Sequence, residues 1–196
     1  MTPASSNDLT ASDSNAASVH SPPRQCCPVA ETPRLLLRRI DRDDLDFFAA
    51  LFADPEVMRF SLGVRTREQS GEWIDRATAT YCQRGYGPWG VVRKLDQTLI
   101  GFCGLLDQTV DGVAEVEVAY RLAEPYWGQG FAPEAAAAAR DLAFGEFRLA
   151  RVIALIDANN IRSVRVAEKI GMDWQTQTLK WGRRLRVYQC TRRAPE

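Results

Sequence analysis

A glycine-rich segment between a predicted strand and a predicted helix constrains this chain most strongly. It reads Trp127-Gly128-Gln129-Gly130-Phe131-Ala132-Pro133-Glu134. Apolar and polar residues alternate over residues 115–122 before it, which predicts a strand, and the alanine-rich residues 134–144 after it predict a helix. Backbone N–H groups converge where a glycine loop opens a helix, and the helix dipole adds about half a positive charge there. We therefore expect a phosphate-bearing ligand at this loop.

The composition is that of one globular domain without a preference for polyanions. The chain has 196 residues, of which 45% are hydrophobic. This length supports one core and is short for two. Basic and acidic residues number 25 each, which argues against nucleic acid and membrane surfaces as partners. No stretch approaches the roughly 20 apolar residues of a membrane span.

Cysteine and histidine usage disfavours metal sites and several nucleophilic mechanisms. The five cysteines are odd in number and form no Cys-x-x-Cys pair. We therefore expect reduced thiols, a cytoplasmic location and no metal. The one histidine, His20, lies near the N-terminus, which removes most Ser-His and Cys-His mechanisms. Cys103 is expected to be a buried core thiol, because no histidine is present to activate it.

Residues 1–30 predict a disordered extension ahead of a domain spanning residues 31–196. The extension is rich in Ser, Ala, Asn, Asp and Pro and nearly lacks large apolar side chains. Such a segment buries too little surface to offset the entropy of ordering it. It also lacks the basic start and apolar stretch of a secretory signal.

The rest of the chain predicts a single mixed α/β domain. An edge strand at residues 34–38 precedes two helices, at 44–53 and from residue 66 to about 81. Three strands follow, at 89–94, 98–106 and 114–122. After the glycine loop and its helix come a strand at 151–156, a helix at 161–170 and a closing hairpin at 172–179 and 185–191. Strands in a meander followed by helix-strand-helix indicate helices packed on a mixed sheet.

Three phosphate-binding patterns compete at the glycine loop. A P-loop requires Lys and Ser/Thr after its last glycine, where Phe131 and Ala132 stand. A dinucleotide fingerprint requires a third small residue where Pro133 stands, in an N-terminal parallel βαβ unit. A pyrophosphate cradle for coenzyme A tolerates Pro133, which suits a first helical position because its missing N–H is no loss there.

The loop resembles the [Arg/Gln]-Gly-x-Gly-x-[Gly/Ala] motif of the GNAT superfamily of acyl-CoA N-acyltransferases. Trp127 in front of it is typical of the branch resembling ribosomal-protein N-terminal alanine acetyltransferases, the RimJ/RimL type. Residues 32–38 resemble that branch's first strand, and residues 117–120 its Glu-hydrophobic-Gly-Tyr strand, with Ala119 replacing glycine. Residues 160–172 resemble its Asn-x-x-Ser…Glu-Lys-hydrophobic-Gly-Phe segment. The resemblance covers residues 31 to about 191 and implies the GNAT fold, a mostly antiparallel, splayed central sheet flanked by helices.

The resemblance implies acetyl-CoA as acyl donor and identifies candidate contacts. The loop N–H groups would hold the pyrophosphate, and the backbone of residues 118–120 would pair with the pantetheine arm as if a strand were added. A main-chain N–H near Val118 would face the thioester oxygen, and such a donor is worth about 3 kcal/mol of barrier. The candidate cofactor contacts are Val118, Ala119, Tyr120, Trp127, Gly128, Gln129, Gly130, Phe131, Ala132, Asn160 and Ser163.

Two residues are candidates for the proton transfers, and each has a structural alternative. Glu117 is the candidate base, or else a solvated or salt-bridged strand residue, with Arg121 as an example of a partner. Ser163 is the candidate acid for the leaving thiolate, or a first-turn helix residue bonded to backbone. Asn160 is a cofactor contact, a helix N-cap, or both.

The acceptor side is less constrained by the sequence. We expect residues 60–67 and 85–89 to shape the acceptor site. The aromatic residues Tyr86, Trp89, Tyr126 and Trp127 either line an acceptor pocket or pack in the core and its rim. The arginines of the closing hairpin, Arg183, Arg184 and Arg186, are expected on a solvated face.

These observations predict an acetyl-CoA-dependent N-acetyltransferase that moves an acetyl group to a primary amine by direct attack. The acceptor is a protein N-terminus or a small amine, such as an amino acid or an aminoglycoside, and the protein is a monomer or a homodimer. The alternatives are a non-catalytic acyl-CoA-binding or sensor domain and, third, a nucleotide-binding enzyme. The fold alone does not choose among acceptors.

Overall fold

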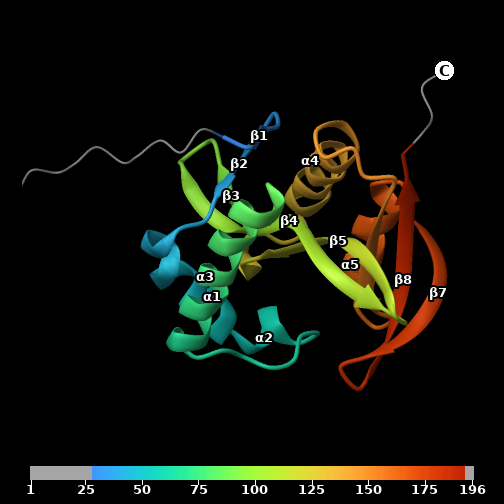
Figure 1. The fold of residues 1–196 in the computed structure, drawn as a ribbon. Coiled ribbons are helices and arrows are strands. Elements are labelled where there is room, and N and C mark those ends of the chain that lie inside the picture. Colours follow the sequence, from blue (N-terminus) through green and yellow to red (C-terminus); the bar gives the residue numbers. More distant parts are fainter. Residues whose placement is uncertain (1–27, 193–196) are drawn as a thin grey trace, which may run out of the picture.

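An eight-stranded sheet forms the centre of the structure, a computed structural model that describes residues 28–192 (Figure 1). The strand order is β1-β2-β3-β4-β5-β6-β8-β7, and every neighbouring pair is antiparallel except β5 and β6. The strands are β1 (Ala30–Glu31), β2 (Leu35–Arg39), β3 (Pro88–Arg93), β4 (Thr98–Val110), β5 (Val113–Leu122), β6 (Arg151–Asp157), β7 (Asp173–Lys180) and β8 (Arg183–Thr191). The expected mixed α/β fold with a mostly antiparallel sheet is confirmed.

Helices cover both faces of this sheet. They are α1 (Leu45–Ala53), α2 (Pro55–Met58), α3 (Arg67–Arg84), α4 (Phe131–Gly145) and α5 (Ile161–Lys169), with short 3-10 turns at Arg42–Asp44 and Glu124–Tyr126. Helices α4 and α5 pack with the main core, whereas α1, α2 and the first half of α3 enclose a second cluster around Phe48 and Phe102. The sheet therefore has an α4/α5 face and an α1/α3 face.

Local signals in the sequence set the element boundaries. Thr66 and Gln69 form the capping box that starts α3, and Gly85 ends that helix with a left-handed φ of 79°. The β4–β5 turn has positive φ at Asp111 and Gly112, the geometry of a tight hairpin turn. The same geometry recurs at residues 181 and 182 between β7 and β8.

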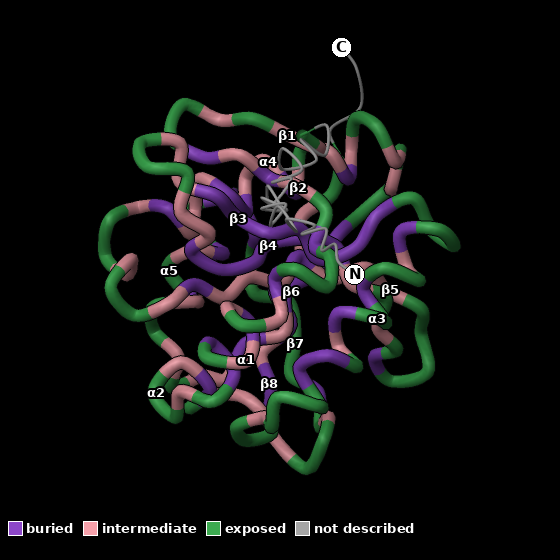
Figure 2. Tube along the Cα trace, turned by 90° about the vertical axis from the view of Figure 1, so that its left-hand side faces the viewer, coloured by how far each residue is buried: buried purple, intermediate pink, exposed green. Residues whose placement is uncertain are grey.

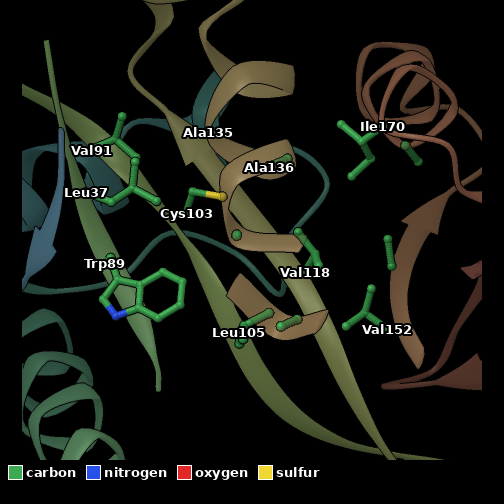
Figure 3. Close-up of a cluster of buried hydrophobic side chains, with 14 of the residues drawn as sticks. Leu37, Trp89, Val91, Cys103, Leu105, Val118, Ala135, Ala136, Val152 and Ile170 are labelled. Atoms are coloured by element: carbon green, nitrogen blue, oxygen red, sulfur yellow. The ribbon is translucent and has the colours of Figure 1, made fainter. Parts of the chain in front are cut away.

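The main core lies between α4 and the central strands, as the buried stretches of Figure 2 show. Figure 3 shows Leu37, Trp89, Cys103 and Val118 on the strands beneath Ala135 and Ala136 of α4. Alanines at 135, 136, 139 and 143 are all fully buried, so α4 packs closely on the sheet. Burial raises the pKa of the Cys103 thiol, and Cys103 is the core residue that the sequence predicted.

Several boundaries differ from the sequence prediction. Residues 28–30 already belong to the fold, because Val29 N–H donates to the carbonyl of Leu37 at 2.8 Å and Ala30 pairs with the same residue. Order thus begins before residue 31, while the predicted disorder of residues 1–27 lies outside the described residues. Strand β4 extends to Val110 because the Asp111–Gly112 turn continues its pairing with β5.

Close strand contact at Gly104 yields a stability prediction. A Cβ atom added there would lie 2.2 Å from the Gly87 carbonyl oxygen and 2.6 Å from the Pro88 Cα. Both are backbone atoms, so Gly104→Ala should lower the melting temperature by roughly 5 °C or more. Gly145→Ala is the matched control, because no atom lies within 4 Å of its added Cβ. Equal melting temperatures for the two variants in a thermal denaturation experiment would contradict this account.

Candidate functional site

The N-terminus of α4 is a helix end without a side-chain cap. Gly130 is its N-cap residue, with a left-handed φ of 80°, and no side chain bonds to the first turn. Among the described residues, no group accepts a hydrogen bond from the N–H groups of Gly130, Phe131 or Ala132. These donors and the positive end of a 15-residue helix point to the same place. An anion at this position would satisfy them.

The helix starts at Phe131, three residues before the stretch 134–144 that the sequence predicts as helical and two residues before Pro133. Because α4 begins at Phe131, Pro133 is the third helical residue and not the first. The first four N–H groups of any helix lack intrahelical acceptors, so proline still costs no hydrogen bond. Because proline has no backbone N–H, Ala132 is the last residue of the loop that can donate a backbone hydrogen bond to a ligand.

An ion pair from β2 fastens this loop to the sheet. Glu134, in the first turn of α4, accepts hydrogen bonds from the Thr32 hydroxyl at 2.5 Å and from the Arg34 backbone N–H at 2.9 Å. Arg34 Nε donates to the second carboxylate oxygen at 2.6 Å. Burial raises the pKa of Glu134, but the bonds from Thr32 and Arg34 together lower the pKa below its usual value.

Arg34 also reaches the loop itself. Its Nη1 donates to the Gln129 carbonyl at 2.9 Å, and its Cζ lies 4.6 Å from the centroid of the Phe131 ring. From the sequence, Arg34 was predicted only as part of the first strand and not as part of the site. The sequence did contain a signal for this contact. Thr32 and Arg34 lie on one segment, and the carboxylate of Glu134 comes just after the loop glycines.

Trp127 supports the loop from the other side. Its indole Nε1 donates to the Leu122 carbonyl at 2.7 Å, and the Arg162 guanidinium of α5 lies 4.6 Å from its ring centroid. Gln129 Nε2 bonds to the Pro125 carbonyl at 2.7 Å. Trp127 is therefore a support between the loop and α5, while Gly128 has open space around it.

Strands β5 and β6 separate beside this loop. They share only one register pair, Glu117 with Ile153, whereas β4 and β5 pair along the whole of β5. Residues 118–122 of β5 consequently have a β4 partner on one side and no strand partner on the other. The splayed sheet expected from the sequence is thus present, and Val118, Ala119 and Tyr120 lie on its unpaired edge.

Glu117 lies at the point of separation. Its carboxylate accepts from Gln108 Nε2 at 2.7 Å and from the Leu155 backbone N–H at 3.3 Å. In a continued parallel ladder that N–H would serve a β5 carbonyl, so the carboxylate replaces a lost sheet bond. Burial raises the pKa of Glu117 to about 7, against the opposing effect of these two bonds. The alternative of an ion pair with Arg121 is wrong, since the two form none within 4 Å.

Asn160 and Ser163 lie across the opening on the α5 side. The Asn160 side chain accepts from the Ser163 N–H at 3.2 Å, which confirms its prediction as N-cap. The Tyr120 hydroxyl of β5 donates to the Ser163 carbonyl at 2.9 Å and connects strand to helix. Burial raises the pKa of Tyr120, so its hydroxyl stays protonated.

The residues expected on the acceptor side separate into two groups. Trp89 is fully buried and stacks on Phe147, and Tyr86 is buried with its hydroxyl bonded to Asp107, so both are packing residues. Residues 60–67 do reach the face that carries Glu117, because Ser61 bonds Arg121.

The hairpin arginines are not all on a solvated face, which corrects the expectation for two of them. Arg183 Nη1 donates to the Ser61 carbonyl at 2.8 Å, and its Nη2 donates to Asp157 at 3.1 Å. Arg186 buries its Nε and lies over Trp174 at 5.5 Å. Only Arg184 of the three is exposed.

Two surface hollows lie away from Glu117. A groove of about 630 Å³ runs between residues 30–33 and the outer side of α4, and a smaller one lies between α1 and α3. The first touches Glu134 but neither borders the unpaired edge of β5. The site is therefore defined by unpaired backbone donors and the half-buried carboxylate of Glu117. None of the helices within residues 28–192 combines the length and apolar character that crossing a membrane requires.

Together these groups provide an anion site, an open strand edge and a proton acceptor. The uncapped end of α4 suits phosphate, and the edge of β5 suits an extended amide-bearing chain. A carboxyl whose pKa lies near neutrality can accept a proton at physiological pH.

Comparison with known proteins agrees with this geometry. The family described as "Acetyltransferase (GNAT) domain" matches residues 34–173. The chain is 37% identical over 161 residues to YkkB of Bacillus subtilis, covering 81% of this chain and 92% of that protein.

Two solved structures illustrate the likeness of the fold. An acetyltransferase from Agrobacterium tumefaciens is 25% identical, with a TM-score of 0.73 over 83% of this chain and 94% of that one. RimL, the ribosomal L7/L12 α-N-protein acetyltransferase, is solved in complex with coenzyme A. It is 16% identical, with a TM-score of 0.70 over 84% of this chain and 98% of that one. The family match covers most of the described residues, and the chain therefore belongs to the GNAT family of acetyltransferases.

Proposed function

We propose that this protein is an acetyl-CoA-dependent N-acetyltransferase acting on a primary amine, with its domain from about residue 28 to 196. One observation carries the proposal: a half-buried carboxyl with a pKa of about 7, Glu117, lies where β5 loses its neighbouring strand. A non-catalytic acyl-CoA-binding domain would need the anion site and the strand edge. It would have no use for a carboxyl tuned toward neutrality, which is costly to bury when ionised.

The residues present fit acetyl-CoA. The unpaired N–H groups of Gly130, Phe131 and Ala132, with Gln129 before them, would hold the pyrophosphate. The unpaired edge at Val118, Ala119 and Tyr120 would bond the amides of the pantetheine arm. Trp127 and Gly128 shape the loop, and Asn160 orders the start of α5 around Ser163.

In direct aminolysis, different residues around the gap between β5 and β6 would carry out the separate proton transfers. Glu117 takes a proton from the ammonium group, directly or through water, so that the amine nitrogen attacks the thioester carbonyl. A β5 N–H near Val118 stabilises the oxyanion. The carbon–sulfur bond then breaks, and the Ser163 hydroxyl is the candidate donor to the thiolate. Because Cys103 is fully buried beneath α4, it offers no covalent route.

The acceptor class includes protein N-termini and small amines. The fold likeness to RimL supports an N-terminal amine, but one fold serves many acceptors. A monomer or homodimer in the cytoplasm remains our prediction. Release of coenzyme A, followed with a thiol reagent over a panel of amines, tests the function. Binding of acetyl-CoA without release for any amine would favour the sensor alternative.

Removing the Glu117 carboxylate should slow the chemical step. Glu117→Gln should lower kcat by roughly 100-fold while leaving the acetyl-CoA Kd within about threefold, because a general base contributes about 10²–10⁴ to the rate. Glu115→Gln is the control, since Glu115 lies on the same face of β5 and pairs with Arg151. Unchanged kcat with a good acceptor would remove Glu117 as the base.

The same substitution should change how stability depends on pH. The pKa of Glu117 rises from 4.5 to about 7 on folding, so the folded protein retains a proton that the unfolded chain releases between these values. Its contribution to stability therefore falls as pH rises through this window, by about 3 kcal/mol at most. Glu117→Gln does not ionise, so the melting temperature of the variant relative to wild type should increase from pH 5 to pH 8. A difference that is independent of pH would contradict the raised pKa.

The loop glycines supply a binding prediction. Gly130→Val should weaken acetyl-CoA binding by at least about tenfold, because valine disfavours φ of 80° and its side chain crowds the phosphate position. Gly112→Val controls for backbone strain, since Gly112 has φ of 83° in the β4–β5 turn with no atom within 4 Å of an added Cβ. Isothermal titration with acetyl-CoA measures both. Equal affinity in the two variants would contradict the cradle at α4.

A further inference from the structure

Two arginine side chains share one aromatic ring on the α1/α3 face. The Arg65 Cζ lies 4.8 Å from the centroid of the Phe52 ring, and the Arg121 Cζ lies 5.9 Å from it. Arg121 lies equally close to Phe102, at 5.9 Å. Arg65 comes from the loop between α2 and α3, and Arg121 comes from β5. Two distant segments thus bring two guanidinium groups together.

Neither guanidinium has an anionic partner among the described residues. No carboxylate lies within 4 Å of Arg65 or Arg121. Arg65 Nη1 is buried without any hydrogen-bond partner, and the guanidinium of Arg121 bonds the Ser61 hydroxyl. The nearby carboxylate of Asp157 already pairs with Arg183.

Two like charges near one another and partly removed from water are unfavourable unless an anion joins them. Burial and the charge of Arg65 together lower the pKa of Arg121 to about 10, with Glu117 opposing. Burial and then Arg76 lower the pKa of Arg65. Both groups nevertheless remain cationic at neutral pH. Buried charges in proteins are normally paired, so this pair implies an anion that the described residues do not supply.

The guanidinium pair lies on the same face of the sheet as Glu117. Strand side chains alternate, so Glu117, Ala119 and Arg121 point to one face, about 13 Å apart from first to last at the Cα atoms. Ala119 between the long side chains carries only a methyl group and is half-buried. Arg65 and Arg121 also keep part of their surface exposed, so a solute can reach them.

We infer that the acceptor is a small amine that also carries a carboxylate or a phosphate, with Arg65 and Arg121 binding this acid group while the amine reaches Glu117. This inference rests on the proposed acetyltransferase function. Two guanidinium groups offer several N–H donors in planar array, the arrangement that binds carboxylate and phosphate oxygens best. Ser61 orients Arg121 and is in turn held by Arg183 through its carbonyl. An amine without an acid group would leave the two charges unpaired.

Matched acceptors test the inference on the wild-type protein. Amino acids are compared with their amides, and phosphoethanolamine with ethanolamine, by coenzyme A release at constant ionic strength. Rates are expressed per neutral amine, so that differences in amine pKa cancel. We expect kcat/KM for the acid-bearing member of at least one pair to be about tenfold or more higher. The two arms distinguish carboxylate from phosphate.

Substitutions then locate the effect. Arg121→Gln and Arg65→Gln should each reduce the ratio of acid to neutral kcat/KM by roughly 10–100-fold, mainly through the acceptor KM. Arg121→Lys should have a ratio between those of Arg121→Gln and wild type, because lysine restores the positive charge but not the paired N–H donors of a guanidinium group. Arg59→Gln is the control, since Arg59 is exposed on the neighbouring segment and pairs with Glu56.

These experiments distinguish failure of the acid-group inference from failure of the proposed acetyltransferase function. Equal or better rates with the neutral members would overturn the inference while the acetyltransferase function stands. So would an unchanged ratio in both Gln variants. No coenzyme A release with any amine, despite acetyl-CoA binding, would instead refute the proposed function. The wild-type comparison needs no variant, so a substitution that prevents folding leaves the test intact.

Discussion

The ending of one strand pairing determines the rest of the site. Strands β5 and β6 lie side by side in the middle of the sheet but share a single register pair at Glu117 and Ile153. Backbone groups that a sheet would normally satisfy are left open, and the carboxylate of Glu117 takes one of them, the Leu155 N–H. That position buries the carboxylate and raises its pKa to about 7. The interrupted pairing of β5 with β6 therefore accounts both for the open strand edge and for a Glu117 carboxyl that can exchange protons near neutral pH.

The second constraint is the attachment of the glycine loop. Arg34 bonds both Glu134 and the Gln129 carbonyl, so strand β2 fixes the first turn of α4. The fully buried alanines of α4 hold the same helix against the sheet. The donors at Gly130 to Ala132 are therefore in place before any anion arrives, which reduces the ordering that binding requires.

Much of this organisation was predictable, and the failures have physical reasons. The start of α3 near residue 66, the closing hairpin and the Asn160 cap depend on local signals, and the sequence predicts each correctly. The start of α4 was wrong by three residues, because Gly130 in left-handed geometry starts the helix before Pro133. Arg34 and Arg121 were missed as site residues, whereas Arg65 lies within residues 60–67, which the sequence predicts to shape the acceptor site. Their partners are distant in the chain, and no periodicity within one segment reveals which guanidinium lacks a carboxylate.

The internal edge of β5 has a consequence for how the protein avoids unwanted association. Unpaired strand edges invite other chains to add a strand, which leads to aggregation. This edge lies in the interior of an eight-stranded sheet, and Tyr120 connects it to α5 through the Ser163 carbonyl. A polypeptide strand added at this edge would need room for its side chains on both faces of the sheet. The hydrogen-bonded contact between Tyr120 and α5 limits that room on one face. The geometry that leaves backbone donors available thus admits a slender ligand in preference to a neighbouring protein's strand.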